Sequence, residues 1–343
     1  RTPLVDYKNQ SKGGVGSRGS RTREADFTEQ LYVANAHDML LFFTRKGRVH
    51  WLKCYEIPEG AKDSKGRAIQ NMLELEPGDS VNAVLEIESH KFVDPEFLQS
   101  HNVVFATKNG TVKKTRLADY SHVRTKGVIA INILEGDEVV NVVLTNGSDE
   151  IILASRNGKA VRFNENLIRT MGRVSTGVRG MNLSLDEEPD NEVIGMIVVH
   201  DPDNDTIMVV SEKGFGKRTK VEDYRMTNRG TKGVKTLNIT DKTGKLLAIN
   251  TVQDDEDLMI INKSGITIRF SVASCRVMSR GTQGVKLIDL KKKNDYIASV
   301  CKVMHIDEDE ELLDELTEGE ENVDVKSADT DAPANNETPE TQE

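Results

Sequence analysis

Apolar runs alternate with glycine turns along this chain, and the pattern predicts five β-hairpins. Each apolar run leads into a polar residue, a turn that ends in glycine and a strand that becomes basic; the turn glycines are Gly47, Gly110, Gly158, Gly214 and Gly265. Asn109-Gly110 and Asn157-Gly158 are favoured in two-residue hairpin turns, because both residue types tolerate positive φ. The 3.6-residue periodicity of helices is absent through most of the chain, which favours an all-β protein.

A second glycine signal recurs between the hairpins. Thr-Lys-Gly-Val, Ser-Thr-Gly-Val and similar tetrapeptides precede short alternating strands, and the series of glycines is Gly13, Gly66, Gly127, Gly177, Gly233 and Gly284. Further runs of β-formers, such as residues 139–144 and 297–303, bring each period to about four strands. A recurring unit of this length predicts a propeller. We therefore expect an all-β, six-bladed β-pinwheel of four-stranded blades over residues 1–304, with the first blade incomplete at the N-terminus.

Charge is distributed very unevenly along the 343 residues. The formal net charge is −10, but residues 307–343 hold 16 acidic residues and one lysine, so residues 1–306 carry 45 Lys and Arg against 40 Asp and Glu. The body is therefore mildly basic. Residues 305–343 have the low hydrophobicity and high charge of a disordered tail. The tail either serves solvation or competes, as a mobile polyanion, for the basic surface of the body.

Cations recur at one position of the predicted hairpins. Four residues after the turn glycines come Trp51, Lys114, Arg162, Arg218 and Arg269. A rotational repeat would place such charges along a curved rim, which could neutralise the phosphates of duplex DNA without reading bases. The simpler alternative is solvated decoration that discourages pairing between sheet edges. The predicted rim residues are Arg18, Arg21, Arg23, Lys113, Lys114, Arg116, Arg124, Lys126, Arg162, Arg173, Arg179, Lys217, Arg218, Lys220, Arg229, Lys232, Arg269 and Arg280.

Motifs for covalent chemistry are missing from the sequence. It contains no Walker loop, GxSxG or HExxH pattern, so we expect no catalytic residue in this chain. Gly14 to Gly19 fits GxGxxG but follows no predicted strand and opens no helix, which argues against a dinucleotide site. Glycines flanked by cations instead favour a loop whose main-chain N–H groups approach phosphates. Tyr7, Tyr120 and Tyr224 recur with the repeat and are predicted to pack in the core.

The cysteines and the hydropathy of the sequence indicate the cellular compartment of the protein and argue against a metal site or a membrane span. The three cysteines, Cys54, Cys275 and Cys301, are widely spaced and form no CxxC pair, which fits reduced thiols in a cytoplasm and no metal site. No apolar run approaches the roughly 18 residues of a membrane span. Because the chain opens with Arg1 inside a repeat, we expect it to be part of a longer polypeptide.

The N-terminal motif resembles a known family. Leu4-Val5-Asp6-Tyr7 leads into Gln10, Ser11, Lys12, Gly13, Gly14, Val15 and Gly16, a segment similar to the gyrase A-box in the C-terminal domains of bacterial DNA gyrase A, which belongs to the type IIA DNA topoisomerases. The resemblance covers residues 1 to about 304. It implies a six-bladed pinwheel whose basic edge wraps duplex DNA for strand passage and negative supercoiling, with the box among the DNA-binding residues. Ser11 and Val15 stand where the family commonly has basic residues, which puts the strength of wrapping in question.

The resemblance also implies partners and cofactors of a larger enzyme. They are the N-terminal strand-passage core of gyrase A and the gyrase B protein, in a heterotetramer of two A and two B subunits. ATP and Mg²⁺ would belong to that holoenzyme, and no cofactor is expected in this chain. Three alternatives stay open: a topoisomerase IV A-subunit domain that binds DNA with little wrapping, a propeller that serves as a protein-interaction platform, and an enzyme with its site in a propeller's central channel.

Overall fold

All five predicted hairpins are present in the computed structural model, which describes residues 1–4, 17–18, 32–61, 64, 66–290 and 295–304. Each hairpin joins two antiparallel strands of six or seven residues through its glycine turn. The strands are β2 (Met39–Thr44) and β3 (Arg48–Lys53), β5 (Asn102–Thr107) and β6 (Thr111–Arg116), β9 (Glu150–Ser155) and β10 (Lys159–Asn164), β13 (Thr206–Ser211) and β14 (Phe215–Lys220), and β17 (Glu256–Asn262) and β18 (Ile266–Ser271).

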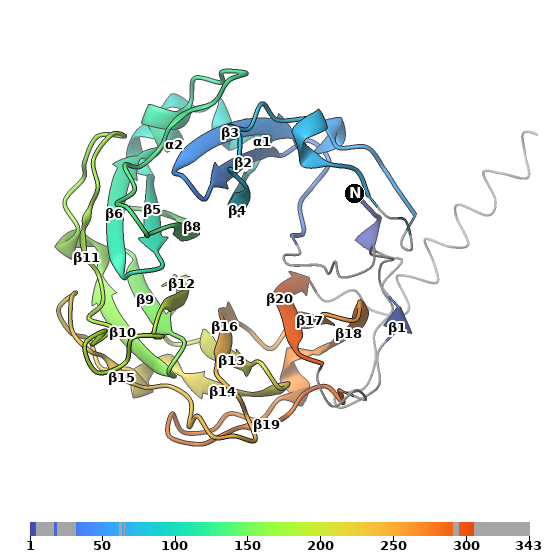
Figure 1. Ribbon diagram of the computed structural model, residues 1–343, viewed down its shortest axis with the longest axis vertical. Coiled ribbons are helices and arrows are strands. Elements are labelled where there is room, and N and C mark those ends of the chain that lie inside the picture. The colour runs from blue at the N-terminus through green and yellow to red at the C-terminus, as the bar shows by residue number, and fades with distance from the viewer. Residues whose placement is uncertain (5–16, 19–31, 62–63, 65, 291–294, 305–343) are drawn as a thin grey trace, which may run out of the picture. The chain divides into compact units, whose positions relative to one another are not determined.

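Each hairpin forms the middle of a four-stranded antiparallel sheet, which we call a blade. The innermost strands are β4 (Val81–Ile87), β8 (Val139–Thr145), β12 (Val193–Val199), β16 (Leu246–Val252) and β20 (Ile297–Met304). The short outermost strands are β7 (Val128–Ile129), β11 (Val178–Arg179), β15 (Val234–Lys235), β19 (Val285–Lys286) and β1 (Ser17–Arg18). In Figure 1 the inner strands face the middle of the ring of blades, and β11, β15 and β19 lie on its outer circumference.

Outer strands are exchanged between consecutive blades. β7 follows the second hairpin in sequence but pairs with β3 of the first blade, with Val128 opposite Val49. The same shift places β11 on β6, β15 on β10 and β19 on β14. At the end of the series, β18 pairs with β1 from the opposite end of the chain, with Ser17 opposite Thr267. Every blade is therefore completed by a segment from another repeat.

The number of blades corrects the prediction from the sequence: the described residues form five blades, not six. The sequence has six glycine signals, but a blade needs a hairpin, and the described residues contain five. The signal at Gly13 precedes β1, which completes the fifth blade. The signal at Gly66 adds no strand to a described sheet. The all-β, propeller-like architecture with four-stranded blades is confirmed.

Hydrophobic cores lie between neighbouring blades. In β5 every side chain is buried: Val103 and Phe105 enter the core shared with the first blade, while Val104 and Ala106 enter the core shared with the third. Because both faces are covered, this central strand is a continuous apolar run instead of an alternating one. Two short helices, α1 (Ser89–Phe92) and α2 (Pro95–Ser100), connect the first and second blades.

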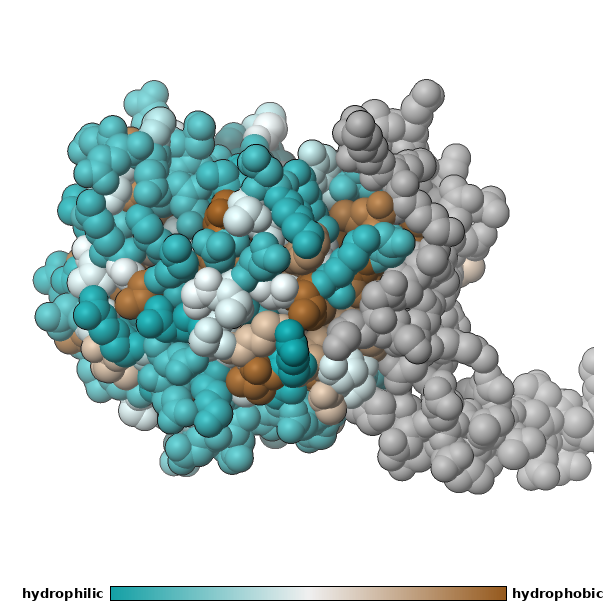
Figure 2. Space-filling view, turned by 90° about the horizontal axis from the view of Figure 1, so that it is seen from below, coloured by the Kyte–Doolittle hydropathy of each residue, from teal (hydrophilic) through white to brown (hydrophobic). Residues whose placement is uncertain are grey.

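The surface seen in Figure 2 is largely hydrophilic, with scattered apolar patches. Among the described residues, no helix combines the length and the apolar character that a bilayer span requires.

Candidate nucleic-acid interface

A short 3-10 turn follows the second strand of every hairpin, and its main-chain carbonyl groups need hydrogen-bond donors. The turns are η2 (Cys54–Glu56), η4 (Leu117–Tyr120), η5 (Glu165–Leu167), η6 (Val221–Asp223) and η7 (Val272–Ser274). Each turn, or the residue just after it, accepts a hydrogen bond from a side chain outside its own blade. The bonds are Arg1 Nε to Ile57 O (3.1 Å), Trp51 Nε1 to Tyr120 O (3.0 Å), Lys114 Nζ to Glu165 O (3.0 Å), Arg162 Nη1 to Tyr224 O (2.9 Å) and Arg218 Nη1 to Cys275 O (3.3 Å).

Lys114, Arg162 and Arg218 are therefore interblade donors, and these cations do not lie on the rim. Lys114 and Arg218 are buried, and the side chain of Arg162 is only 11% exposed. Arg269, at the same position in the fifth blade, is buried against Asp257, with 2.9 Å between Nε and Oδ2, and donates to Met304 O. This corrects the outward position that the repeat predicted for these side chains. For Lys114, Arg162 and Arg218 the reason is that buried carbonyl groups of the next blade require a partner at this position. Arg269 instead bonds groups of its own blade.

Lys113 and Lys217 are also buried, on the opposite face of the same strands. Lys113 Nζ donates to Ala130 O (2.6 Å) and Arg173 O (2.5 Å). Lys217 Nζ donates to Ser279 O (2.8 Å) and Thr282 O (2.9 Å), and contacts Arg280 O. The predicted outward position is therefore corrected for these two lysines as well.

Exposed cations gather in four other segments, which we call the rim segments: residues 121–129, 169–179, 225–235 and 276–286. Each runs from a 3-10 turn to the end of an outer strand. Together they hold twelve Lys and Arg and no acidic residue, whereas the rest of residues 1–306 holds 33 Lys and Arg against 40 Asp and Glu. Without these four segments, residues 1–306 would carry a net charge of −7.

Most rim-segment cations reach solvent on the outer circumference, where Figure 1 places β11, β15 and β19. The exposed ones are Arg124, Lys126, Arg169, Arg179, Arg225, Lys232, Lys235, Arg276 and Lys286, and the partly buried ones are Arg173, Arg229 and Arg280. Arg169, Arg225, Lys235, Arg276 and Lys286 were not among the predicted rim residues. The signal that could have found them is the recurrent lack of acidic residues between each turn and the following Gly-Val.

The last three rim segments touch one another, so their charges form a continuous track. Arg229 donates from Nε to Leu167 O and from Nη1 to Arg179 O, both at 2.9 Å. Arg280 repeats the contact one blade on, because its Nη1 lies 2.9 Å from Lys235 O. These bonds fix two rim arginines against the preceding segment.

Other predicted residues lie beside the track or outside the described residues. Arg116 and Lys220 are exposed at the ends of β6 and β14. Arg18 is described only through the main chain of β1. The box residues Gln10, Ser11, Lys12, Gly13, Gly14, Val15 and Gly16, together with Arg21, Arg23 and the acidic tail, lie outside the described residues. Tyr120 and Tyr224 are fully buried, as predicted from their spacing.

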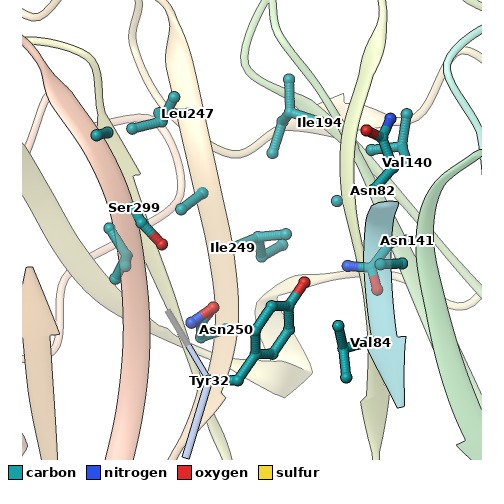
Figure 3. Close-up of a pocket in the computed structure, with 15 residues that line it drawn as sticks. Tyr32, Asn82, Val84, Val140, Asn141, Ile194, Leu247, Ile249, Asn250 and Ser299 are labelled. Atoms are coloured by element: carbon teal, nitrogen blue, oxygen red, sulfur yellow. The ribbon is translucent and has the colours of Figure 1, made fainter. Parts of the chain in front are cut away.

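The inner strands line a cavity of about 240 Å³ in the middle of the ring, into which Tyr32 points (Figure 3). Asn82 Nδ2 donates to Val139 O (2.9 Å) and Asn141 Nδ2 to Met196 O (3.2 Å), so these amides tie neighbouring inner strands together. Within the described part of the chain, the residues around this cavity include no Asp, Glu, His, Cys, Lys or Arg.

The family model and the similar proteins of known name indicate the same family. Residues 1–35, 38–88, 101–146, 149–200, 205–253 and 256–300 match the family described as DNA gyrase C-terminal domain, beta-propeller. Five of these six segments contain a hairpin, and the first contains β1. The DNA gyrase A subunits of Staphylococcus aureus strains NCTC 8325 and MRSA252 are both 40% identical over 339 residues. The match covers 99% of this chain, which spans 37% of the length of these relatives.

Solved structures agree on the fold. A structure of a DNA gyrase A C-terminal domain has a TM-score of 0.75 at 22% identity and covers 88% of this chain and 94% of its own. The C-terminal domain of a DNA topoisomerase IV has a TM-score of 0.67 at 26% identity and covers 83% of this chain and 84% of its own.

Proposed function

This chain belongs to the family of DNA gyrase C-terminal domains, and from that premise we propose that it binds duplex DNA along the four rim segments and wraps it around the outside of the blades. The observation that carries this proposal is the distribution of charge: twelve exposed or partly exposed cations and no acidic residue follow the outer circumference. A regular line of phosphates is the partner that such a track fits.

The proposed binding is insensitive to sequence. Arginine and lysine side chains that contact phosphates release condensed counterions, which makes affinity depend steeply on salt but not on base identity. Bending costs on the order of 1 to 6 kcal/mol for each 20 to 30 bp bent by 40 to 90°. Several blades must therefore contribute contacts, and the repetition of the rim segments over four consecutive repeats supplies them.

The box would extend the track at the fifth blade. Ser17 follows Gly16 directly in sequence and pairs with Thr267 at the outer edge of that blade. Lys12, Arg18, Arg21 and Arg23 belong to a stretch, residues 8–23, that again has no acidic residue. We propose that DNA passes from the rim segments onto this stretch.

In the larger enzyme, the wrapped duplex would be presented with one handedness to the strand-passage core of gyrase A. The gyrase B protein would supply the ATP site, and negative supercoils would result. The contribution proposed for this chain is binding and orientation, without covalent chemistry. Membership of the gyrase family and 40% identity to gyrase A proteins favour this role over a topoisomerase IV domain, which would bind DNA with little wrapping.

Ligation of nicked circular DNA in the presence of the chain tests the proposal. We expect the linking number of the ligated circles to shift in proportion to bound protein at low salt, because a wrapped duplex traps writhe. Binding without a shift would favour the topoisomerase IV role. If the chain failed to bind DNA at low salt, the role of a protein-interaction platform would replace the proposal.

A further inference from the structure

Lys217 occupies an unusual position beneath the rim. Its ammonium group is buried under rim segment 276–286 and bonds Ser279 O, Arg280 O and Thr282 O, with Thr282 Oγ1 a further acceptor at 3.2 Å. One cation therefore holds the main chain on both sides of Arg280. An ammonium group has three donors, so all of them are engaged by this one loop.

Lys113 repeats the arrangement two blades earlier. Its ammonium group bonds Arg173 O at 2.5 Å and Ala130 O at 2.6 Å, and lies 5.4 Å from the centre of the Phe105 ring. Arg173 and Arg280 are equivalent residues, each four before the glycine of its Gly-Val signal. In both blades, the buried lysine therefore bonds the main-chain oxygen of the rim arginine at the equivalent position.

The fold itself does not require a cation here. The same position, three residues after the turn glycine, is occupied by Val161 in the third blade and by Ile268 in the fifth, and both are buried. Burying a charge is costly unless its hydrogen bonds are satisfied. The lysines must therefore contribute something besides packing at these two blades.

Resting on the proposed function, we propose that Lys113 and Lys217 are positioning residues of the DNA-binding rim: each buried ammonium group fixes the main chain that presents a rim arginine, Arg173 or Arg280, to a phosphate. Neither lysine reaches DNA itself, because both are fully enclosed. The Arg280 guanidinium is fixed at its other end by Lys235 O, 2.9 Å from Nη1, so the loop is held from two sides.

Titration gives this positioning a measurable signature. Burial lowers the pKa of Lys217 to about 8, with nearby Arg280 acting in the same direction and Asp223 opposing it. Burial likewise lowers the pKa of Lys113 to about 7, where Asp119 raises it and Arg173 lowers it. Deprotonation removes the charge and one N–H donor from the loop. The hydrogen bonds from Lys217 to the main chain around Arg280 should therefore weaken as pH rises through 8, well before ordinary lysines titrate near 10.

A double-mutant cycle between Lys217 and Arg280 tests the proposal, with affinity for a linear duplex measured at low salt. We expect Lys217→Met and Arg280→Ala each to weaken binding about fivefold. The double variant should bind no more weakly than either single variant, because both substitutions remove the same phosphate contact. Ile268→Met, at the same position in the fifth blade, is the matched control and should change affinity by less than about twofold. An additive loss in the double variant, or unchanged binding by Lys217→Met, would overturn the proposal.

The pH profile tests the same idea without a substitution at the buried Lys217. From pH 7.5 to 9.5 the affinity of the unaltered chain should fall about fivefold, while that of Arg280→Ala stays level; parallel profiles would overturn the proposal. The proposed function has a separate outcome. If the unaltered chain does not shift the linking number, the proposed wrapping is wrong. If the unaltered chain does shift it, but Lys217→Met binds DNA as Ile268→Met does, only the positioning role is wrong.

Discussion

The indole Nε1 of Trp51, on the first blade, donates to the main-chain oxygen of Tyr120 on the second blade at 3.0 Å. Lys114, Arg162 and Arg218 make the corresponding bond at later blades. What the position requires is an N–H donor that crosses to the next blade, and a positive charge is only one way to supply it. The boundary between blades is therefore held by polar contacts at its outer end as well as by the apolar core.

Removing an interblade donor should destabilise the fold without touching the rim. Arg218→Met removes the side-chain donor that Val272 O and Cys275 O share, and we expect a loss of about 3 kcal/mol in the free energy of unfolding. Urea denaturation would measure the loss. Lys220→Met, an exposed cation two residues away, should change the free energy of unfolding by less than about 0.5 kcal/mol. Equal losses in the two variants would contradict the interblade role of Arg218.

The glycine of the second signal should tolerate no side chain. Gly233 has φ of +75°, and a Cβ there would lie 2.3 Å from Ala160 O. Gly233→Ala should therefore cost at least about 2 kcal/mol in the free energy of unfolding, from backbone strain and the close contact together. Gly172→Ala is the control, since a Cβ at Gly172 would meet nothing within 4 Å. Thermal denaturation of both variants checks the contrast, and similar midpoints would show that outer-strand exchange does not depend on this glycine.

Rim cations should set the salt dependence of DNA binding. Arg169, Arg225 and Arg276 each open a rim segment and are exposed. Replacing all three with Ala should reduce the magnitude of the slope of log affinity against log salt by about 3, because each phosphate contact contributes about 0.9. Filter binding at several salt concentrations would measure this slope. An unchanged slope would mean that DNA follows another surface.

Stability should rise with pH through the titration of Lys217. Its pKa is about 8 in the folded chain against an ordinary value of 10.5, so between these values the unfolded chain binds more protons. The free energy of unfolding contributed by this group therefore increases from pH 8 toward 10.5. Between pH 8 and pH 10 the free energy of unfolding of the unaltered chain should rise by about 2 kcal/mol relative to that of Lys217→Met, measured by urea denaturation at each pH. A constant difference would show that the buried lysine keeps its ordinary pKa.

Hairpins and turns could be predicted from the sequence because they depend on local patterns, namely continuous apolar strands and Asn-Gly turns. The number of blades could not. Outer strands pair with the preceding repeat. Gly13 precedes β1, which completes the fifth blade, and the Gly66 signal adds no strand to a described sheet, so neither glycine marks a blade of its own. Pairing between repeats is a property of the folded ring and leaves no local trace.

The sequence also did not reveal whether the aligned cations point to solvent or into the protein. Lys114, Arg162 and Arg218 look like surface residues in sequence, but the blade that follows covers them. Trp51 at the same position was the available clue, because a tryptophan in a series of cations indicates a buried site that needs an N–H group. The exposed residues lie in the segments that follow, where the absence of acidic residues, and not the alignment of basic ones, marks the surface.

Bending of a short duplex tests the central claim most directly. A duplex of about 40 bp, labelled at both ends for resonance energy transfer, should show its ends drawn together when the chain binds. Replacing Arg225, Lys232 and Lys235 with Ala should abolish this approach, while replacing Lys46, Lys91 and Lys302, which lie outside the rim segments, changes net charge equally and should leave it intact. If the two triple variants bent DNA equally, the rim segments would not be the surface that curves it.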